Sequence, residues 1–373
     1  MKKVKLSIGD YMIDIVEVKT PKQQKEFALF PLSLYRDCPY YIPNLQVSER
    51  GIFKSNNPDQ KSVFFLAYQK DVLVGRIGGI INNLYNEKMG VKQVRFTRFD
   101  SINDYEVAKA LFKAVEEWAI SNGMDSVHGP MGFNDLEKMG IQVSDFTSEG
   151  NIITQFNFPY YKKLLEKCGY LPDASFIECK IFEPKGFKIE LSNDKFHNVK
   201  TVNSGKLLKK YKGQVFDLIN ESYIPVYGAV PITPTLKEKL INQFKFLINL
   251  DFISIVADNN DKVVGFGVAI PGIAKEMKES KGKLVSMQSF KMLKAFNKPN
   301  YAEILLACVS NQCKDCGLEK LIISKMLLGF KKYNIRSINT NPVIYNDFCQ
   351  NILSNFEYIK HKKRVVYYKQ LIN

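Results

Sequence analysis

The chain has 373 residues, of which 45% are hydrophobic and 12% aromatic, and its formal net charge is +15. This length favours two domains of ordinary size, and this apolar content excludes a disordered chain. Asp10 and Asp14 interrupt any signal-like apolar segment after the first lysines. No apolar run reaches the roughly 18 to 20 residues of a membrane-spanning helix. We therefore expect a soluble, cytoplasmic protein.

The cysteines and histidines do not form a metal-binding pattern. The seven cysteines are scattered along the chain, which is typical of a reducing compartment. Cys313 and Cys316 form a CxxC motif, but no second CxxC and no paired histidines accompany it. We expect reduced thiols and no metal.

The excess of positive charge favours an anionic partner, which could be a phosphorylated cofactor, an anionic membrane surface or a nucleic acid. Neither zinc-finger spacing nor an RNP-type aromatic motif is present, so nucleic acid is the least favoured of the three. Most lysines have the spacing of solvated helix faces, which is the plainer explanation of the charge.

The first half predicts a mixed order of helices and strands. Apolar alternation predicts an antiparallel hairpin, 63–68 with 72–81, and then a strand from Gln93 to Phe99. A helix follows, with Asn103 as its expected N-cap and Gly123 at its end. Further elements are predicted in this order: a strand at 126–128, a helix at 160–168 and a strand at 176–182.

The second half repeats this order. Helices are predicted at 207–223 and 236–248, a hairpin at 252–257 with 263–270, a strand at 303–309 and a helix from Leu318. Gly75 and Gly265 occupy matching places in the two hairpins, which indicates two copies of one domain. The predicted domain boundaries are 1–183 for the first domain, 184–200 for a linker and 201–373 for the second domain, with a Lys-rich insertion at 275–300.

Polar residues cluster after the strand at 126–128. The strand ends at Gly129-Pro130, and Asn134, Asp135 and Glu137 follow in a loop. Polar residues just past a strand end are where α/β proteins usually keep their sites. The alternative is a turn-rich connection whose Asn and Asp cap backbone groups. From the chemistry alone the two interpretations are close to even.

The segment from Val309 to Leu318 joins a strand to a helix through a short loop. Free N–H groups and the helix dipole at such a junction favour an anion. An ordinary β–α turn is the alternative, and spacing alone modestly favours it.

The repeated order resembles the GCN5-related N-acetyltransferase (GNAT) fold. In more detail it resembles a bacterial family of N-acyltransferase-like proteins of about this length, which is distantly similar to bacterial ceramide synthases. The motifs that carry the resemblance are Leu34-Tyr-Arg-Asp-Cys-Pro with Ile42-Pro43, Val74-Gly-Arg-Ile77, Trp118, Gly129-Pro-Met, Asn134-Asp with Glu137 and Gly140, and Asn157-Phe-Pro-Tyr-Tyr161. The resemblance implies an α/β fold with a mixed α+β sheet in two tandem GNAT-like domains.

The resemblance also implies acetyl-CoA or a longer acyl-CoA as co-substrate. In that superfamily the cofactor lies where two central strands splay apart, with its pyrophosphate at the loop-to-helix junction. The first half departs from the superfamily's glycine-rich loop pattern, and the second half retains Lys314 and Gly317 but has Glu319 in place of a small residue. The position of the tyrosine that often protonates the leaving thiolate is Leu165 in the first half and Leu353 in the second.

On this resemblance we expect acyl-CoA on the second domain, while the polar loop of the first domain faces the amine. The expected cofactor-binding residues are Val309, Lys314, Gly317, Leu318 and Asn346. Glu137 or Asp135 is expected to accept the ammonium proton, and Tyr160 or Tyr161 to hydrogen-bond the acyl group or donate to sulfur. Asn134, Asn157 and Arg76 are expected to contact the substrate.

Two functions remain open. The first is an acyl-CoA-dependent N-acyltransferase that transfers an acetyl or longer acyl group to an unidentified small or lipid-like amine, and a lipid-like amine would bring peripheral contact with an anionic membrane. The second is a GNAT-derived binding or regulatory protein without catalysis.

Overall fold

A computed structural model describes residues 4–8, 11–54, 57–184, 187–190, 205–222, 226–244, 247–283, 295–313 and 316–371, with side chains from residue 13 onward except at 183, 243–244 and 347–348. The chain forms two compact units. Unit 1 contains residues 1–176, 277–286 and 362–373, and unit 2 contains 177–276 and 287–361. The units therefore do not coincide with the two halves of the sequence.

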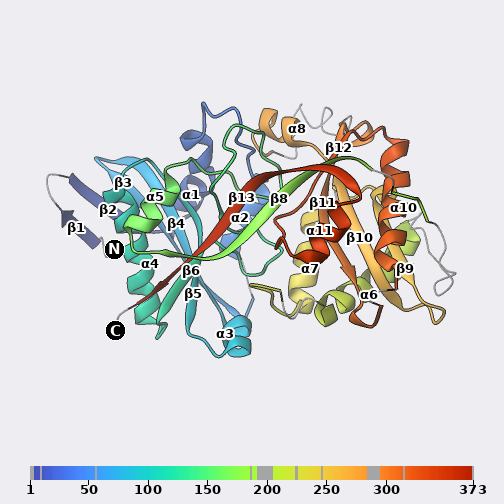
Figure 1. The fold of residues 1–373 in the computed structure, drawn as a ribbon. Helices are drawn as coiled ribbons and strands as arrows, with labels where there is room; N and C mark the ends of the chain where they lie inside the picture. Colours follow the sequence, from blue (N-terminus) through green and yellow to red (C-terminus); the bar gives the residue numbers. More distant parts are fainter. Residues whose placement is uncertain are drawn as a thin grey trace. The chain divides into compact units, whose positions relative to one another are not determined.

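The first half of the chain contains most of the elements of unit 1 (Figure 1). They are β1 (Val4–Ile8), β2 (Tyr11–Glu17), α1 (Pro21–Leu34), α2 (Gln46–Gly51), η1 (Ile52–Lys54), β3 (Gln60–Gln69), β4 (Val72–Asn82), α3 (Asn83–Met89), β5 (Gln93–Ser101), α4 (Tyr105–Ser121), β6 (Ser126–Gly129), β7 (Ile141–Gln142), α5 (Tyr161–Lys167) and β8 (Leu171–Pro184).

The second half contains most of the elements of unit 2. They are α6 (Gly205–Ser222), α7 (Pro234–Phe244), η2 (Leu250–Phe252), β9 (Ile253–Ala257), β10 (Val263–Pro271), α8 (Ala274–Glu279), β11 (Tyr301–Val309), η3 (Asn311–Cys313), α10 (Leu318–Lys332), β12 (Ser337–Asn339), α11 (Asp347–Leu353) and β13 (Phe356–Gln370). Most of the predicted linker at 184–200 and part of the predicted insertion at 275–300 lie outside the described residues.

The same order of elements occurs twice. The series β3, β4, β5, α4, β6, α5, β8 in the first half matches β9, β10, β11, α10, β12, α11, β13 in the second. In each series the hairpin and the third strand are antiparallel, and the third and fourth strands are parallel. The predicted mixed α/β class and the predicted repeat are confirmed.

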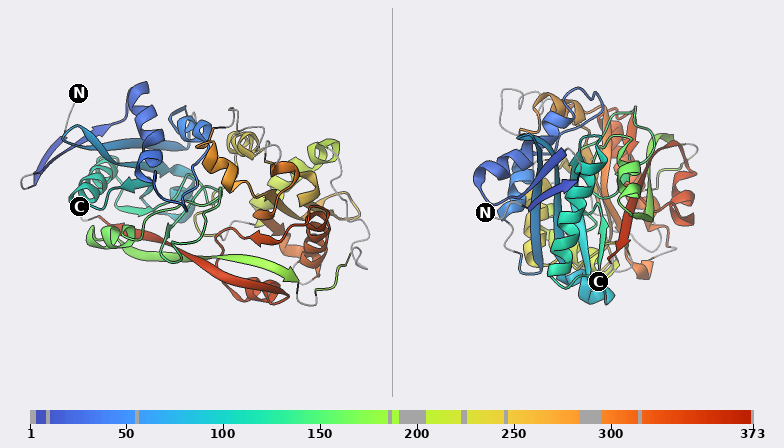
Figure 2. Two further views of the ribbon diagram at one scale, coloured as in Figure 1. Left: turned by 90° about the horizontal axis from the view of Figure 1, so that it is seen from above. Right: turned by 90° about the vertical axis from the view of Figure 1, so that its left-hand side faces the viewer.

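In unit 1 the strands follow the order β1-β2-β3-β4-β5-β6-β13. Helix α4 lies along one face of these strands (Figure 2), because its apolar side packs into the core that strands β2 to β6 share. Gly75 makes this close approach possible, since a Cβ there would lie 2.7 Å from Leu111 of α4. Neighbouring residues of a strand face opposite sides. Arg76 accordingly points to the other face, toward α1 and α2.

In unit 2 the strands follow the order β8-β12-β11-β10-β9. Helix α10 covers one face, and a Cβ at Gly265 would lie 2.8 Å from Leu318 of that helix. Glycine is needed at positions 75 and 265 for the same physical reason: at each position a helix packs closely against the second strand of a hairpin. The sequence predicted their equivalence but not this cause.

The last strand of each half of the chain divides between the two units. The C-terminal part of β13 belongs to unit 1, where Tyr367 lies opposite Gly129 of β6 and Val365 lies opposite Ile141 of β7. The C-terminal part of β8 belongs to unit 2, where Ile181 lies opposite Ile338 of β12. Each unit thus takes a sheet strand from the half of the chain that supplies the other unit.

Candidate functional site

In both units the two parallel central strands pair only at their beginnings. Strand β5 pairs with β6 over 93–95, although β5 continues to Ser101. Strand β11 pairs with β12 over 301–303, although β11 continues to Val309. Beyond these pairs the facing edges of the strands carry no ladder between them. The splay that the resemblance implied is therefore present in each unit.

In unit 1 two tyrosines occupy the end of β5. The buried Tyr161 hydroxyl lies 2.8 Å from the Tyr35 hydroxyl and accepts a hydrogen bond from the Ser101 N–H at 3.1 Å. The Tyr160 hydroxyl donates to the Ser101 carbonyl at 2.7 Å. Burial and the nearby Asp100 carboxylate raise the pKa of Tyr161 well above its usual range. The backbone N–H and carbonyl of Ser101 are therefore both hydrogen-bonded within unit 1.

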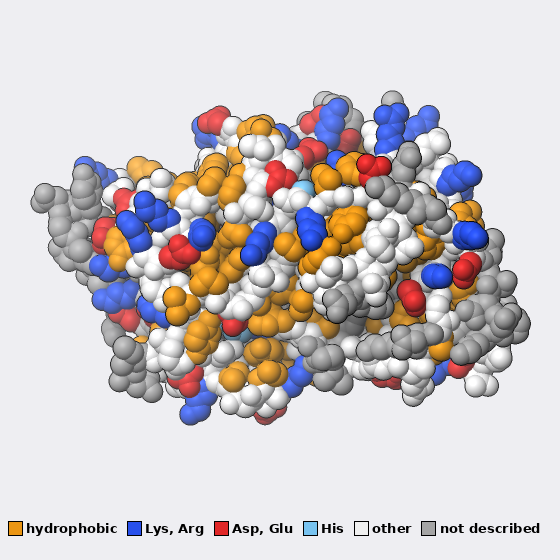
Figure 3. Space-filling view, viewed as in Figure 1, with side chains coloured by type: hydrophobic (Ala, Val, Ile, Leu, Met, Phe, Trp, Pro, Cys, Tyr) orange, Lys and Arg blue, Asp and Glu red, His pale blue; other side chains and the backbone are white. Residues whose placement is uncertain are grey.

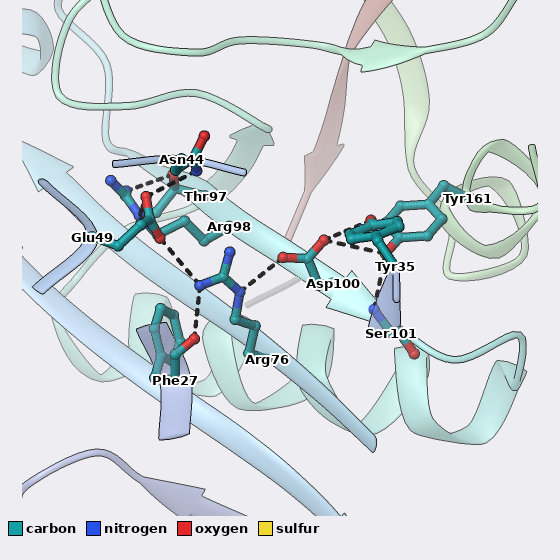
Figure 4. A network of polar contacts seen from close by, with 10 residues as sticks. All are labelled: Phe27, Tyr35, Asn44, Glu49, Arg76, Thr97, Arg98, Asp100, Ser101 and Tyr161. Carbon is teal, nitrogen blue, oxygen red and sulfur yellow. Dashed lines mark hydrogen bonds and ion pairs between the residues drawn. The ribbon is translucent and has the colours of Figure 1, made fainter. Parts of the chain in front are cut away.

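Tyr161 belongs to a buried polar network that also contains Arg76 (Figure 4). The Arg76 Nε donates to the Asp100 carboxylate at 2.8 Å, and its Nη1 donates to Glu49 at 3.1 Å and to the Phe27 carbonyl at 2.8 Å. Burial opposes the charge of Glu49, but the guanidinium groups of Arg98 and Arg76 outweigh it and lower its pKa to about 2. Each of these buried charges has a partner of opposite charge, and such pairing allows a buried group to remain ionised.

The N-terminus of α4 is closed by a side chain of its own loop. Asn103 was the expected N-cap, but Asp104 is the residue that caps the helix. The Asp104 carboxylate accepts hydrogen bonds from the N–H groups of Glu106 at 2.8 Å and Val107 at 3.4 Å. A carboxylate that already occupies these donors repels a phosphate, so this junction does not suit a pyrophosphate.

The corresponding junction in unit 2 is different. Helix α10 begins after Gly317, whose φ is +73°, and no side chain of the described residues caps it. Val309 ends β11, and Leu318 is buried below the first turn. Glu319 stands in that first turn and opposes an anion. These residues fit a pyrophosphate better than their counterparts in unit 1 do, because the helix donors are not taken by a carboxylate.

Of the two remaining predicted cofactor residues, the structure describes only Asn346. The Asn346 side chain caps α11 by accepting a hydrogen bond from the Cys349 N–H at 3.0 Å. Lys314 lies outside the described residues.

The predicted polar loop of unit 1 is a folded segment held by its own amides. The Asn134 side-chain Oδ1 accepts hydrogen bonds from the N–H groups of Leu136 at 2.9 Å and Glu137 at 3.1 Å. The Asn157 side chain forms two hydrogen bonds with the backbone of Gln142, at 2.7 and 3.0 Å. These contacts are the ones that the turn-rich alternative predicted. The buried Asn134 amide nitrogen, however, has no partner among the described residues.

The two acidic residues of this loop differ in their chemistry. Burial raises the pKa of Asp135 to about 6, against the partial opposition of Arg95 and Lys88. Glu137 packs against the backbone of Gly132, where a Cβ would lie 2.4 Å from its side chain. Burial thus makes the Asp135 carboxyl easier to protonate than an exposed aspartate.

Buried cations from β13 hold the same loop. Arg364 donates to the Gln155 carbonyl at 2.5 Å, and Lys362 donates to the Glu149 carbonyl at 2.5 Å. These two residues were not predicted from the sequence, because the basic run 360–364 is typical of a solvent-exposed strand. Glu49 was not predicted either, because it resembled an ordinary surface carboxylate.

The structure thus brings Arg76, Tyr160 and Tyr161 together around β5, and places the Asn157 contacts elsewhere in the loop. Among the described residues no group of His, Cys, Asp and Glu side chains suits a metal ion. Within the same ranges no helix is long and apolar enough to cross a membrane. On the face drawn in Figure 3, lysines and arginines are spread among other side chains rather than gathered in one patch.

A repeated unit with a splayed parallel strand pair and a strand-loop-helix junction defines the tandem GNAT fold, and this chain has that fold. A tandem GNAT protein from the clavulanic acid biosynthesis pathway, in a structure without acetyl-CoA, has a TM-score of 0.60 with 10% identity and covers 96% of this chain and 98% of its own. No model of a protein family matches the sequence.

Two curated proteins are similar in sequence. Protein YghO of Escherichia coli is 26% identical over 278 residues, which are 72% of this chain and 71% of that protein. A bacterial ceramide synthase of Caulobacter vibrioides is 23% identical over 294 residues, 75% of this chain and 76% of that protein. The expected resemblance to the GNAT superfamily and to bacterial ceramide synthases is therefore confirmed at the level of fold and distant sequence similarity.

Proposed function

We propose that the protein is an acyl-CoA-dependent N-acyltransferase whose acyl donor binds unit 2. The observation that carries the proposal is the N-terminus of α10, which no side chain of the described residues caps and which follows the splayed strand β11. Its counterpart in unit 1 is capped by Asp104. A nucleotide with a pyrophosphate needs free donors, so unit 2 is the better of the two candidates.

In this proposal the first N–H groups of α10 hold the pyrophosphate, and Gly317, which has no side chain, leaves room for it to approach. Beyond residue 303, β11 has no strand ladder with β12, and the proposal places an extended acyl-CoA arm along this edge, as a sheet edge accepts an added strand. Leu353 is apolar and 3% exposed, so it supplies no proton for the departing thiolate. The donor of that proton is a different group from the usual tyrosine.

We further propose an amine as the acceptor of the acyl group. The similarity to a bacterial ceramide synthase makes a lipid-like amine the first class of acceptor to test.

The test of the donor site is a calorimetric titration of the full chain with acetyl-CoA and with a long-chain acyl-CoA. Two variants at one position form a matched pair, because Asn and Asp both tolerate a positive φ and differ by one charge. We expect Gly317→Asp to bind roughly tenfold more weakly than Gly317→Asn, since a unit charge within about 5 Å of a phosphate costs on the order of 1 to 2 kcal/mol near a surface. Asp104→Asn, which keeps a cap in unit 1, should leave binding unchanged.

Failure of the folded protein to bind either thioester would refute the proposal. A stronger effect at Asp104 than at Gly317 would move the donor site to unit 1. The second candidate function, a binding protein without catalysis, is favoured by the capped junction of unit 1 and by the apolar Leu353. Binding of acyl-CoA with no amine-dependent release of CoA thiol, across short and long amines, would support that alternative.

A further inference from the structure

Unit 1 contains a small pocket on the sheet face opposite α4. Helices α1 and α2 form its walls, with Pro31 and Glu49 among the lining residues, and Arg76 and Lys281 line it as well. The space measures about 250 Å³ including the part that is open to solvent. The enclosed part has room for about one water molecule, so a ligand can place an oxygen atom of its end group there while the rest of the group lies in the open part.

A buried guanidinium group lines this pocket. Arg76 is 2% exposed, and its Nε and Nη1 are used by Asp100, Glu49 and a backbone carbonyl. Its third nitrogen, Nη2, donates no hydrogen bond to any of the residues drawn in Figure 4. Arginine presents its nitrogens in a planar fork that suits carboxylate and phosphate oxygens.

The charges around the pocket leave a positive excess. The carboxylates of Glu49 and Asp100 are balanced by the guanidinium groups of Arg76 and Arg98. Lys138 donates to the side chain of Asn44, a lining residue, and its charge contributes to the low pKa of Glu49. Lys281 adds a further positive charge, which is exposed at the pocket. An anionic group is therefore the ligand chemistry that the surroundings favour.

The backbone at Lys281 has an unusual conformation. Its φ is +52°, a region that favours glycine, and Gly282 follows with φ of +75°. The Lys281 and Gly282 carbonyls each accept a hydrogen bond from Gln46 at 2.9 Å, and a Cβ at Gly282 would lie 2.0 Å from the Asn44 carbonyl oxygen. These contacts with α2 and its preceding loop hold a lysine in a strained turn beside the pocket. Strain of this kind is common where a backbone fixes a ligand contact.

We propose that this pocket binds the anionic end group, a carboxylate or a phosphate, of a small ligand, with Arg76 in its wall and Lys281 at its mouth. The site lies within unit 1 and does not depend on acyl transfer. Arg76 was expected from the sequence to contact the substrate, and in this proposal it lines the site of the anionic end group.

The experiment titrates the full-length protein with acetate and, separately, with inorganic phosphate at constant ionic strength, using two-dimensional NMR or calorimetry. Arg76→Gln is unsuitable alone, because it leaves two buried carboxylates short of a partner and endangers folding. The test variant is therefore Lys281→Glu, and the matched control is Lys283→Glu, which reverses an exposed lysine two residues away that does not line the pocket.

We expect one equivalent of acetate or phosphate to bind, with roughly tenfold weaker affinity in Lys281→Glu and less than a twofold change in Lys283→Glu. Preference for acetate would identify a carboxylate ligand, and preference for phosphate a phosphorylated one. The absence of saturable binding of both anions would overturn the proposal. Equal weakening in the two variants would also overturn it, because general surface charge would then explain the binding.

Discussion

Replacement of Tyr367 by alanine tests whether β13 completes unit 1. Tyr367 is 1% exposed, lies opposite Gly129 of β6, and belongs to the hydrophobic core of unit 1. A tyrosine of this kind buries roughly 150 to 250 Å². Alanine retains part of this buried area, so we expect a loss of about 3 to 5 kcal/mol, the range of aromatic-to-alanine substitutions in protein cores. That is a large part of a typical folding free energy of about 5 to 15 kcal/mol.

The protein contains a reporter for this measurement. Its single tryptophan, Trp118, lies on α4 and packs on Gly79 in unit 1. A urea titration followed by Trp118 fluorescence therefore follows the unfolding of unit 1. With a slope of about 1 to 3 kcal/mol per molar urea, we expect the midpoint of Tyr367→Ala to fall by about 1 M or more.

The neighbouring Tyr368 supplies a matched control on the same strand. Its side chain is only partly buried, so Tyr368→Ala should cost less than about 1 kcal/mol. If the last strand served only the C-terminal half of the chain, Tyr367→Ala would leave the Trp118 transition unchanged while circular dichroism showed a loss of structure. That result would refute the assignment of residues 362–371 to unit 1.

Two further predictions concern the polar groups of unit 1. The pKa of Asp135 is about 6 in the folded protein, above its ordinary 3.8, so between these values the folded protein keeps a proton that the unfolded chain has lost. The free energy of unfolding should therefore fall by up to about 3 kcal/mol as pH rises from 4 to 6. In a pH series of urea titrations, Asp135→Asn should remove this dependence. Tyr161→Phe should cost about 1 to 3 kcal/mol by the same assay, because it leaves the buried Ser101 N–H without its acceptor. Tyr160→Phe should cost under about 1 kcal/mol, because its hydroxyl is less buried. Equal losses would contradict the assignment of Tyr161 to the buried hydrogen-bond network.

Local patterns predicted most of the individual elements. The hairpin of β3 and β4 and the amphipathic helix α4 were predicted because their apolar spacing is regular and their turns are marked by polar residues or glycine. The N-cap of α4 was predicted one residue early, because Asn103 and Asp104 are both good capping residues and the sequence does not separate them.

The division of the chain into units could not be read from these patterns. Both β8 and β13 are long strands that follow a short helix, and their alternation fits a place in either sheet. Which sheet each strand joins depends on pairings between distant residues, such as Tyr367 with Gly129. The same reason applies to Glu49, Arg364 and Lys362, since a charged residue is buried only where distant segments supply its partners.

The two strand-loop-helix junctions show how one fold can serve different ligand chemistry in its two copies. In unit 1 the Tyr161 hydroxyl accepts the Ser101 N–H and the Asp104 carboxylate occupies the first donors of α4. A phosphate would have to displace both and approach a negative charge, so the resemblance alone overstates what this copy can bind. The pocket that contains Arg76, which we propose binds an anion, lies on the opposite face of the same strands. An anion in that pocket needs none of these backbone donors. Closure of the junction therefore does not prevent unit 1 from binding a ligand, but it requires that ligand to be held by side-chain cations instead of a helix N-terminus.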